Sequence, residues 1–277
     1  MLIFIINTFC YIFTILTYIL LGESMFNVGD YVTRKSYNND IVFQIVDIQN
    51  DVYYLKGVYI RLYADSFGND LVLSDYENDN LDSFKPSIDE YRNLDRNEYF
   101  YLPGRVLHLD GDKDYLAKCM SFYKRNKVRA YGLYLPENDM PGQVVSLIKK
   151  YMPDILVLTG HDSFSRSKRE NYKNTSNFAL AVTEARRYEK SHERLFIIAG
   201  ACQSNYEDLI KAGANFASSP KRINIHALDP AIIASCLSFS NKNADIDIIK
   251  ILDKTKYGAN GMGGIITKGS MYIGYPR

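Results

Sequence analysis

The chain has 277 residues, of which 47% are hydrophobic and 23% are charged, and its formal net charge is +1. This length suits one large domain or a small and a medium one, and the composition is that of an ordinary globular protein. A net charge so close to zero gives no electrostatic case for nucleic acid as a partner.

Residues 1–24 differ in composition from the rest of the chain. Residues 2–21 carry no charged side chain, and about 20 apolar residues are enough to span a bilayer. The segment has no Lys or Arg, so the positive charge that marks a signal peptide or orients a membrane helix is missing. Gly22-Glu23 before Met25 matches a translated ribosome-binding site. We expect Met25 to be the start and residues 1–24 to be mistranslated upstream sequence, the alternative being a hydrophobic membrane anchor.

Residues 25–73 alternate β-branched or aromatic residues with polar ones, and Asn38-Asn39 and Asn50-Asp51 supply turn signals. This pattern predicts short strands that form a small SH3-like β-barrel, a binding module. Residues 74–100 are rich in Asp, Glu and Asn. We predict a polar linker there, with at most one short helical piece.

From Tyr101 onward, short apolar runs alternate with helical patterns, which is typical of a mostly parallel sheet with helices on both faces. Residues 101–277 are therefore predicted to form one α/β domain of the flavodoxin-like kind. The predicted strands are 105–109, 128–133, 155–159, 195–199, 215–217 and 223–226. The predicted helices are 112–125, 141–151, 177–190, 206–212, one that Asp229-Pro230 opens, and 243–254. The Gly-rich tail predicts a turn and a closing hairpin.

The four cysteines, at positions 10, 119, 202 and 236, include no CxxC pair. This spacing argues against a disulfide framework or a zinc site, and it favours a reducing compartment with one functional thiol. Cys119 and Cys236 fall inside predicted helices, where free cysteines are usually buried small apolar residues.

Two reactive side chains follow predicted strands directly. His161 comes after the run 155–159 and Gly160, and Cys202 comes after the run 195–199 and Gly200. Ligands of open α/β sheets sit at the carboxyl ends of the strands, where a thiol and an imidazole can act as nucleophile and base. A following helix N-terminus and nearby backbone N–H groups would favour the thiolate and an oxyanion. A buried structural cysteine and a histidine without a role are the alternative interpretation.

Other polar residues leave alternatives open. His108 and His226 also close predicted strands, and either could line the same edge. Asp110 and Asp112 follow the first strand of the α/β domain, and two such carboxylates can hold Mg²⁺. We favour Asp112 as a helix cap instead, because no phosphate-binding loop accompanies the pair.

Several long strings resemble the YabG family of sporulation-specific cysteine peptidases. They include VGDYVTRKSYNNDIVFQIVDI, YLKGVYIRLYADS, PGRVLHLDGDKDYL, PDILVLTGHDS and IIAGACQSNYEDLIKAGANFASSPKRINIHALDP. The resemblance runs from about Met25 to the end of the chain. More distantly, the two strand-end motifs are similar to those of caspase-, legumain- and gingipain-like peptidases, which implies a caspase-like fold for the α/β domain. Asp162 stands after His161 where that superfamily has Gly, which is a departure.

The resemblance implies an endopeptidase that works through a Cys202–His161 dyad without a cofactor or metal. Backbone N–H groups near Gly160 or Cys202 would hold the oxyanion. It also implies a preference for a basic residue before the cut, which requires an acidic pocket residue. The candidates for that acid are Asp162, Glu207 and Asp229.

The resemblance further implies that the substrates are spore coat proteins and precursors of germination proteins. The location would be the cytoplasm of the sporulating cell and later the spore coat. The basic loop 165–174 is a candidate site of self-cleavage, and no membrane partner is expected unless residues 1–24 are genuine. The rival interpretations are a non-catalytic spore-coat scaffold and a metal-dependent hydrolase that uses Asp110 and Asp112.

Overall fold

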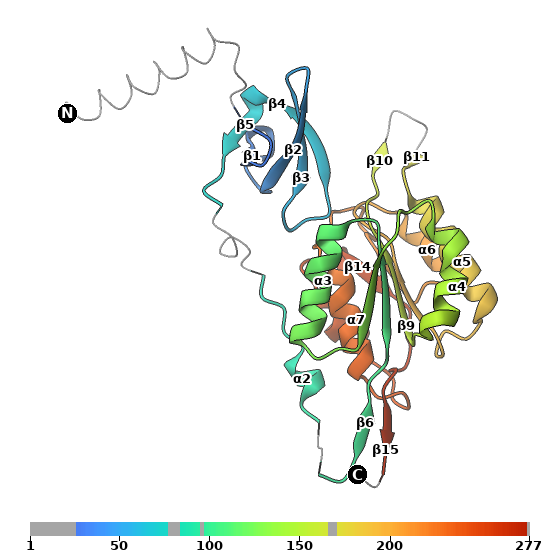
Figure 1. Cartoon of the computed structure of the whole chain (residues 1–277). Coiled ribbons are helices and arrows are strands. Elements are labelled where there is room, and N and C mark those ends of the chain that lie inside the picture. The colour runs from blue at the N-terminus through green and yellow to red at the C-terminus, as the bar shows by residue number, and fades with distance from the viewer. Residues whose placement is uncertain (1–25, 77–83, 95–96, 166–170, 276–277) are drawn as a thin grey trace. The chain divides into compact units, whose positions relative to one another are not determined.

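A computed structural model of the chain describes residues 26–76, 84–94, 97–165 and 171–275 (Figure 1). Three parts of the chain discussed above lie outside the described residues: the segment 1–24, the expected start at Met25, and residues 166–170 of the basic loop. Within the described ranges, no helix has both the length and the apolar character needed to cross a membrane. The chain divides into two compact units, one with the described residues of 1–58 and 63–81, the other with those of 59–62 and 82–277.

The first unit is built on a five-stranded antiparallel sheet with strand order β4-β3-β2-β1-β5. Its strands are β1 (Tyr31–Arg34), β2 (Phe43–Gln49), β3 (Val52–Gly57), β4 (Tyr63–Phe67) and β5 (Leu71–Leu73). Asn50 and Asp51 both have positive φ between β2 and β3, as the predicted two-residue hairpin turn requires. An antiparallel sheet is therefore confirmed, whereas closure into an SH3-like barrel stays a prediction.

The second unit contains a six-stranded, mostly parallel sheet with order β14-β13-β12-β9-β7-β8. The parallel strands are β7 (Val106–Asp110), β8 (Ala130–Tyr134), β9 (Ile155–Thr159), β12 (Phe196–Ala199) and β13 (Phe216–Ser218). Only β14 (Met262–Gly264), paired with β13, runs antiparallel. The predicted α/β class with a mostly parallel sheet is thus confirmed, and its relation to caspase-like or flavodoxin-like folds stays a prediction.

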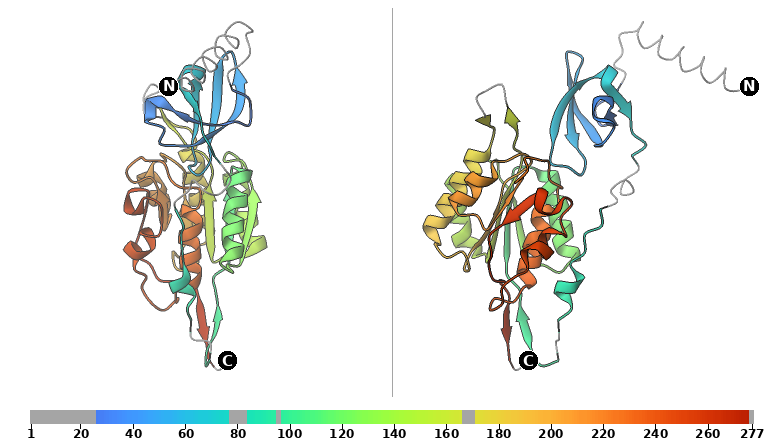
Figure 2. Two further views of the ribbon diagram at one scale, coloured as in Figure 1. Left: turned by 90° about the vertical axis from the view of Figure 1, so that its left-hand side faces the viewer. Right: turned by 180° about the vertical axis from the view of Figure 1, so that it is seen from behind.

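Helices cover both faces of this sheet (Figures 1 and 2). One face packs against α4 (Met140–Tyr151), α5 (Thr175–Tyr188) and α6 (Tyr206–Ala212), and that core includes Leu109, Leu158 and Ile197. The other face carries α3 (Lys113–Arg125) and α7 (Asp229–Phe239), and α7 is buried along its whole length. Burial on both faces explains the continuous apolar runs of β9 and β12 in the sequence.

Three predicted elements differ from the structure. Residues 223–226 form no strand, only one isolated bridge from His226 to Ile60. The last helix, α8 (Ile248–Leu252), is shorter than the predicted 243–254. The predicted closing hairpin is wrong, because β14 joins the main sheet and β15 (Tyr272–Gly274) pairs with β6 (Phe100–Leu102). These pairings join segments far apart in sequence, which no local pattern signals. This unit also contains two short helical pieces, α2 (Asp89–Arg92) and the 3-10 turn Gly258–Asn260, and a two-stranded antiparallel ladder of β10 (Phe164–Ser165) and β11 (Asn171–Tyr172).

Candidate active site

The strand order places three strand ends side by side at the carboxyl edge of the parallel sheet. Strand β9 pairs with β7 on one side and with β12 on the other. Asp112 follows β7, His161 follows β9 and Cys202 follows β12. The hydroxyl of Thr159 donates to the carbonyl of Gly200 over 2.9 Å, which joins the last two strand ends directly.

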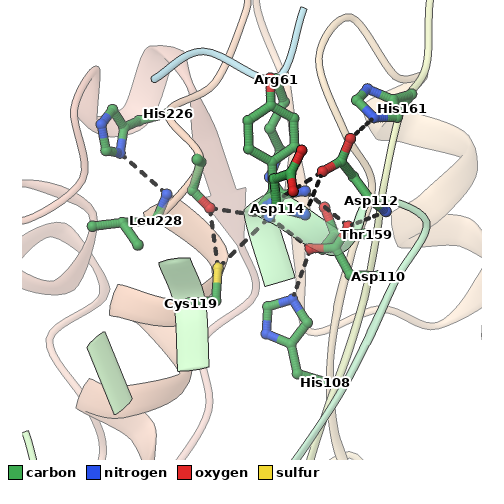
Figure 3. Close-up of polar contacts among 12 residues, drawn as sticks. Arg61, His108, Asp110, Asp112, Asp114, Cys119, Thr159, His161, His226 and Leu228 are labelled. Atoms are coloured by element: carbon green, nitrogen blue, oxygen red, sulfur yellow. Dashed lines mark hydrogen bonds and ion pairs between the residues drawn. The ribbon is translucent and has the colours of Figure 1, made fainter. Parts of the chain in front are cut away.

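His161 is held by two neighbouring carboxylates. Its Nε2 lies 2.9 Å from Oδ2 of Asp112 (Figure 3), and its backbone N–H donates to Oε1 of Glu137 over 2.8 Å. The imidazole also lies beside the ring of Tyr115, with centroids 5.6 Å apart. With 17% of its side chain exposed, His161 is oriented by its surroundings yet remains open to solvent.

The Asp112 carboxylate contacts two parts of the fold, the start of α3 and the side chain of His161. Its Oδ1 accepts from the backbone N–H groups of Asp114 and Tyr115, which makes it the N-cap of α3 and confirms the predicted cap. Its Oδ2 takes the contact with His161. This second contact was not predicted from the sequence, because 49 residues separate the two positions. The sequence did carry one indication of the contact between Asp112 and His161: both residues follow predicted strands whose carboxyl ends lie at the same edge of the sheet.

Cys202 is fully buried in this conformation. Its Sγ lies 3.2 Å from the backbone nitrogen of Ile225 and 3.7 Å from that residue's carbonyl oxygen. Burial is the main cause that raises the pKa of the Cys202 thiol to about 12. The thiol is therefore protonated at neutral pH and covered by backbone.

The backbone N–H groups around Cys202 differ in their hydrogen bonding. The N–H of Gly200 donates to the carbonyl of Leu158, and the N–H of Gln203 to the hydroxyl of Ser219. Among the residues that the structure describes, the N–H of Cys202 has no acceptor. Of these three groups, the N–H of Cys202 is the one left to bind an oxyanion, whereas Gly200 is engaged by the sheet.

The three carboxylates considered for a substrate pocket all have internal partners. Asp162 accepts from the backbone of Ser163 and Asn174 and from the hydroxyls of Thr175 and Ser204. Glu207 is paired with Arg222 at the surface. Asp229 is buried and accepts from the backbone N–H groups of His226 and Lys256. Glu207 is the most exposed of the three, with 54% of its side chain accessible.

The other two candidate histidines, His108 and His226, are buried. Nδ1 of His108 lies 3.0 Å from the hydroxyl of Tyr123, and burial lowers the pKa of His108 below its usual value. Nδ1 of His226 accepts from the backbone N–H of Leu228 over 3.1 Å, and its ring packs against Phe84. Neither closes a strand as predicted, because His108 lies in the middle of β7 and His226 lies outside the sheet. Of the three candidate histidines, His161 is thus the most exposed.

Asp110 forms a buried ion pair that sequence reasoning did not foresee. Both of its oxygens accept from the guanidinium of Arg61, over 3.0 and 2.9 Å, and both side chains are fully buried (Figure 3). Burial alone would raise the pKa of Asp110, but Arg61 holds it down at about 2. The donor atoms of His108, Asp110 and Cys119 lie within 4.8 Å of one another. A metal ion at this cluster would either have to displace the Arg61 guanidinium from Asp110 or be repelled by its positive charge. Both alternatives disfavour a metal site.

The second unit is an α/β domain whose candidate site, a thiol and a carboxylate-bound imidazole, lies at the carboxyl ends of parallel strands. The family model for YabG peptidase U57 matches residues 27–94 and 83–276. The sporulation-specific protease YabG of Bacillus subtilis (strain 168) is 39% identical over 284 residues, covering 91% of this chain and 98% of that protein. No solved structure matches the chain. The chain therefore belongs to the YabG peptidase family.

Proposed function

We propose that the protein is a sporulation-specific cysteine endopeptidase that cleaves spore coat proteins and precursors of germination proteins. Membership of the YabG peptidase family supports peptidase activity, and the name of the B. subtilis relative supports a role in sporulation. The observation that carries the cysteine mechanism is the pairing of β9 with β12, which delivers His161 and Cys202 at adjacent strand ends. The protein would act in the cytoplasm of the sporulating cell and later associate with the coat.

In this proposal, Cys202 and His161 divide the chemistry between them. His161 takes the thiol proton, and the sulfur attacks the carbonyl carbon of the scissile peptide bond. The proton then passes from His161 to the departing amine, and water hydrolyses the thioester. The N–H of Cys202, with one near Gly160, would stabilise the oxyanion. The dyad needs no cofactor.

The reaction requires a change around Cys202. A buried thiol with a pKa near 12 is a poor nucleophile. The segment 219–228, which carries Ile225, must therefore move away before a substrate carbonyl can reach the sulfur. We propose that the described conformation is the resting state of the peptidase.

The preference for a basic residue before the cut needs a carboxylate at the site. Asp162, Glu207 and Asp229 remain the proposed candidates, and exposure favours Glu207, whose partner Arg222 already shows how this carboxylate binds a guanidinium. The same preference would allow self-cleavage in the basic loop 165–174.

The experiment is a cleavage assay on the purified full chain with spore coat protein extract. Wild type is compared with Cys202→Ala and His161→Gln, and Cys236→Ala is the control because Cys236 is a buried cysteine in α7. We expect both dyad variants to lose cleavage and Cys236→Ala to keep it. Loss in Cys202→Ala alone would move the base to another histidine. Unchanged cleavage in Cys202→Ala would overturn the cysteine mechanism.

A further inference from the structure

We propose that Asp112 is a positioning residue for His161, which fixes the tautomer and the orientation of the imidazole. The inference rests on the proposed function and adds a third side chain to the dyad. It starts from the 2.9 Å contact between Oδ2 of Asp112 and Nε2 of His161 (Figure 3).

The Asp112 carboxylate is a rigid support. It is 6% exposed, and its Oδ1 is fixed by two backbone N–H groups of α3, over 2.9 and 3.0 Å. The positive end of the helix macrodipole favours the negative charge at this position. With Oδ1 anchored by the helix backbone, the carboxylate is held in one orientation, and its Oδ2 makes the contact with Nε2 of His161.

The contact determines which ring nitrogen can act as base. An ionised carboxylate only accepts hydrogen bonds, so Nε2 of His161 must carry the proton. In the neutral imidazole, Nδ1 then holds the lone pair that can take a proton from the thiol. When His161 becomes an imidazolium, the Asp112 charge stabilises it, as carboxylates do behind other catalytic histidines.

The backbone of His161 is anchored from the opposite side. Its N–H donates to Oε1 of Glu137, a residue of the loop between β8 and α4. Ring and backbone are therefore held by two different elements, α3 and the β8–α4 loop. Removal of the Asp112 contact would leave the main chain of His161 in place and free the ring to rotate.

Asp112→Asn separates the two roles of this residue. Asparagine is as good an N-cap as aspartate, so α3 keeps its cap while the negative charge behind His161 is lost. The control is Asp247→Asn, the same replacement at the N-cap of α8, where Asp247 accepts from the backbone N–H of Lys250 over 3.0 Å. Asp112→Ser also caps the helix but is too short to reach His161, and it serves as the second variant if Asp112→Asn does not fold.

Two rates are measured on the full chain: cleavage of spore coat protein extract, and alkylation of Cys202 by iodoacetamide, followed by peptide mapping. We expect Asp112→Asn to slow cleavage about 100-fold. Alkylation of Cys202 should slow to the rate of His161→Gln, because that reaction depends on removal of the thiol proton. The double variant Asp112→Asn/His161→Gln should be no slower than His161→Gln, and Asp247→Asn should match wild type.

The outcomes separate this inference from the proposed function. Wild-type rates in Asp112→Asn or Asp112→Ser, with His161→Gln inactive, would overturn the role of Asp112 and leave the dyad standing. Wild-type rates in His161→Gln would overturn both. Slow cleavage with unchanged alkylation would also overturn the inference, since it would show that Asp112 acts on the substrate or the fold and not through the imidazole.

Discussion

The backbone of Ile225 closes over the thiol of Cys202, with its nitrogen 3.2 Å and its carbonyl oxygen 3.7 Å from the sulfur. Arg222, three residues earlier in the chain, anchors the segment 219–228 that contains Ile225. Its guanidinium donates to the hydroxyl of Tyr172 and to the carboxylate of Glu207. The accessibility of the proposed nucleophile is therefore coupled to the attachment of the segment 219–228.

Arg222→Gln should make Cys202 easier to alkylate. The replacement removes the ion pair with Glu207 and the hydrogen bond to Tyr172. Together these two contacts stabilise the closed position of the segment 219–228 by roughly 1 kcal/mol. We expect the alkylation rate of Cys202 by iodoacetamide to rise about 5-fold in the native protein. Arg187→Gln is the control, because Arg187 forms an exposed pair with Glu184 on α5. An unchanged rate in Arg222→Gln would show that this anchor does not limit access.

Loss of one partner of the buried Arg61–Asp110 pair should destabilise the fold strongly. Arg61→Met leaves the Asp110 carboxylate buried without its cation, and such changes typically cost about 3–5 kcal/mol. The free energy of unfolding in urea gives the measurement. The double variant Arg61→Met/Asp110→Leu should recover much of the loss, because it leaves no buried charge behind. Arg105→Met, at the partly exposed pair with Asp154, should cost about 1 kcal/mol or less, and an equal cost at both pairs would contradict the prediction.

The regular part of the α/β fold could be predicted from the sequence, because each element is marked locally. The strand 155–159 and the helix 206–212 agree with the structure to the residue. The strand is an apolar run that stops just before Gly160. The helix stops just before Gly213, whose φ of 110° lies in the left-handed region that glycine adopts without strain and that commonly ends helices. Strand ends also follow from the pattern, which is why the edge with His161 and Cys202 was foreseeable.

The contacts at that edge could not be predicted, since they join distant segments. Arg61 comes from residues 59–62, inside the stretch predicted to be a β-barrel, yet it clusters with the second unit and pairs with Asp110. Nothing in the neighbourhood of Arg61 marks it as buried. The cover over Cys202 was missed for a similar reason: residues 223–226 look like a strand, but they lie outside the sheet and contact the thiol through backbone.

Chelation should leave the peptidase activity unchanged. Both oxygens of Asp110 are occupied by Arg61, and those of Asp112 by the α3 backbone and His161. Neither carboxylate is thus placed to bind Mg²⁺ without losing an existing partner. We expect EDTA to have no effect on cleavage of spore coat protein extract and iodoacetamide to abolish it. Loss of cleavage in EDTA that added Mg²⁺ restores would bring back the metal-dependent hydrolase.

Asp229 should make the stability of the protein depend on pH between about 4 and 6. Burial raises the pKa of this carboxyl from 3.8 to about 6, although His226 and two backbone N–H groups act in the opposite direction. Because the folded pKa is the higher one, the folded state binds the proton more tightly. The resulting stabilisation is fully present below pH 4 and is lost as the pH rises through 6.

Comparison with Asp229→Asn isolates this contribution, because asparagine does not titrate. The free energy of unfolding of wild type, relative to the variant, should fall by about 2 kcal/mol between pH 4 and pH 7. Urea unfolding at several pH values measures it, and the exposed Asp253→Asn controls for the loss of one charge. A difference that stays constant would mean that folding does not shift the pKa of Asp229. One that grows with pH would mean that the backbone N–H groups of His226 and Lys256 stabilise Asp229 as a carboxylate. In that case a negative charge at the start of α7 would be a permanent feature of the edge that carries Cys202.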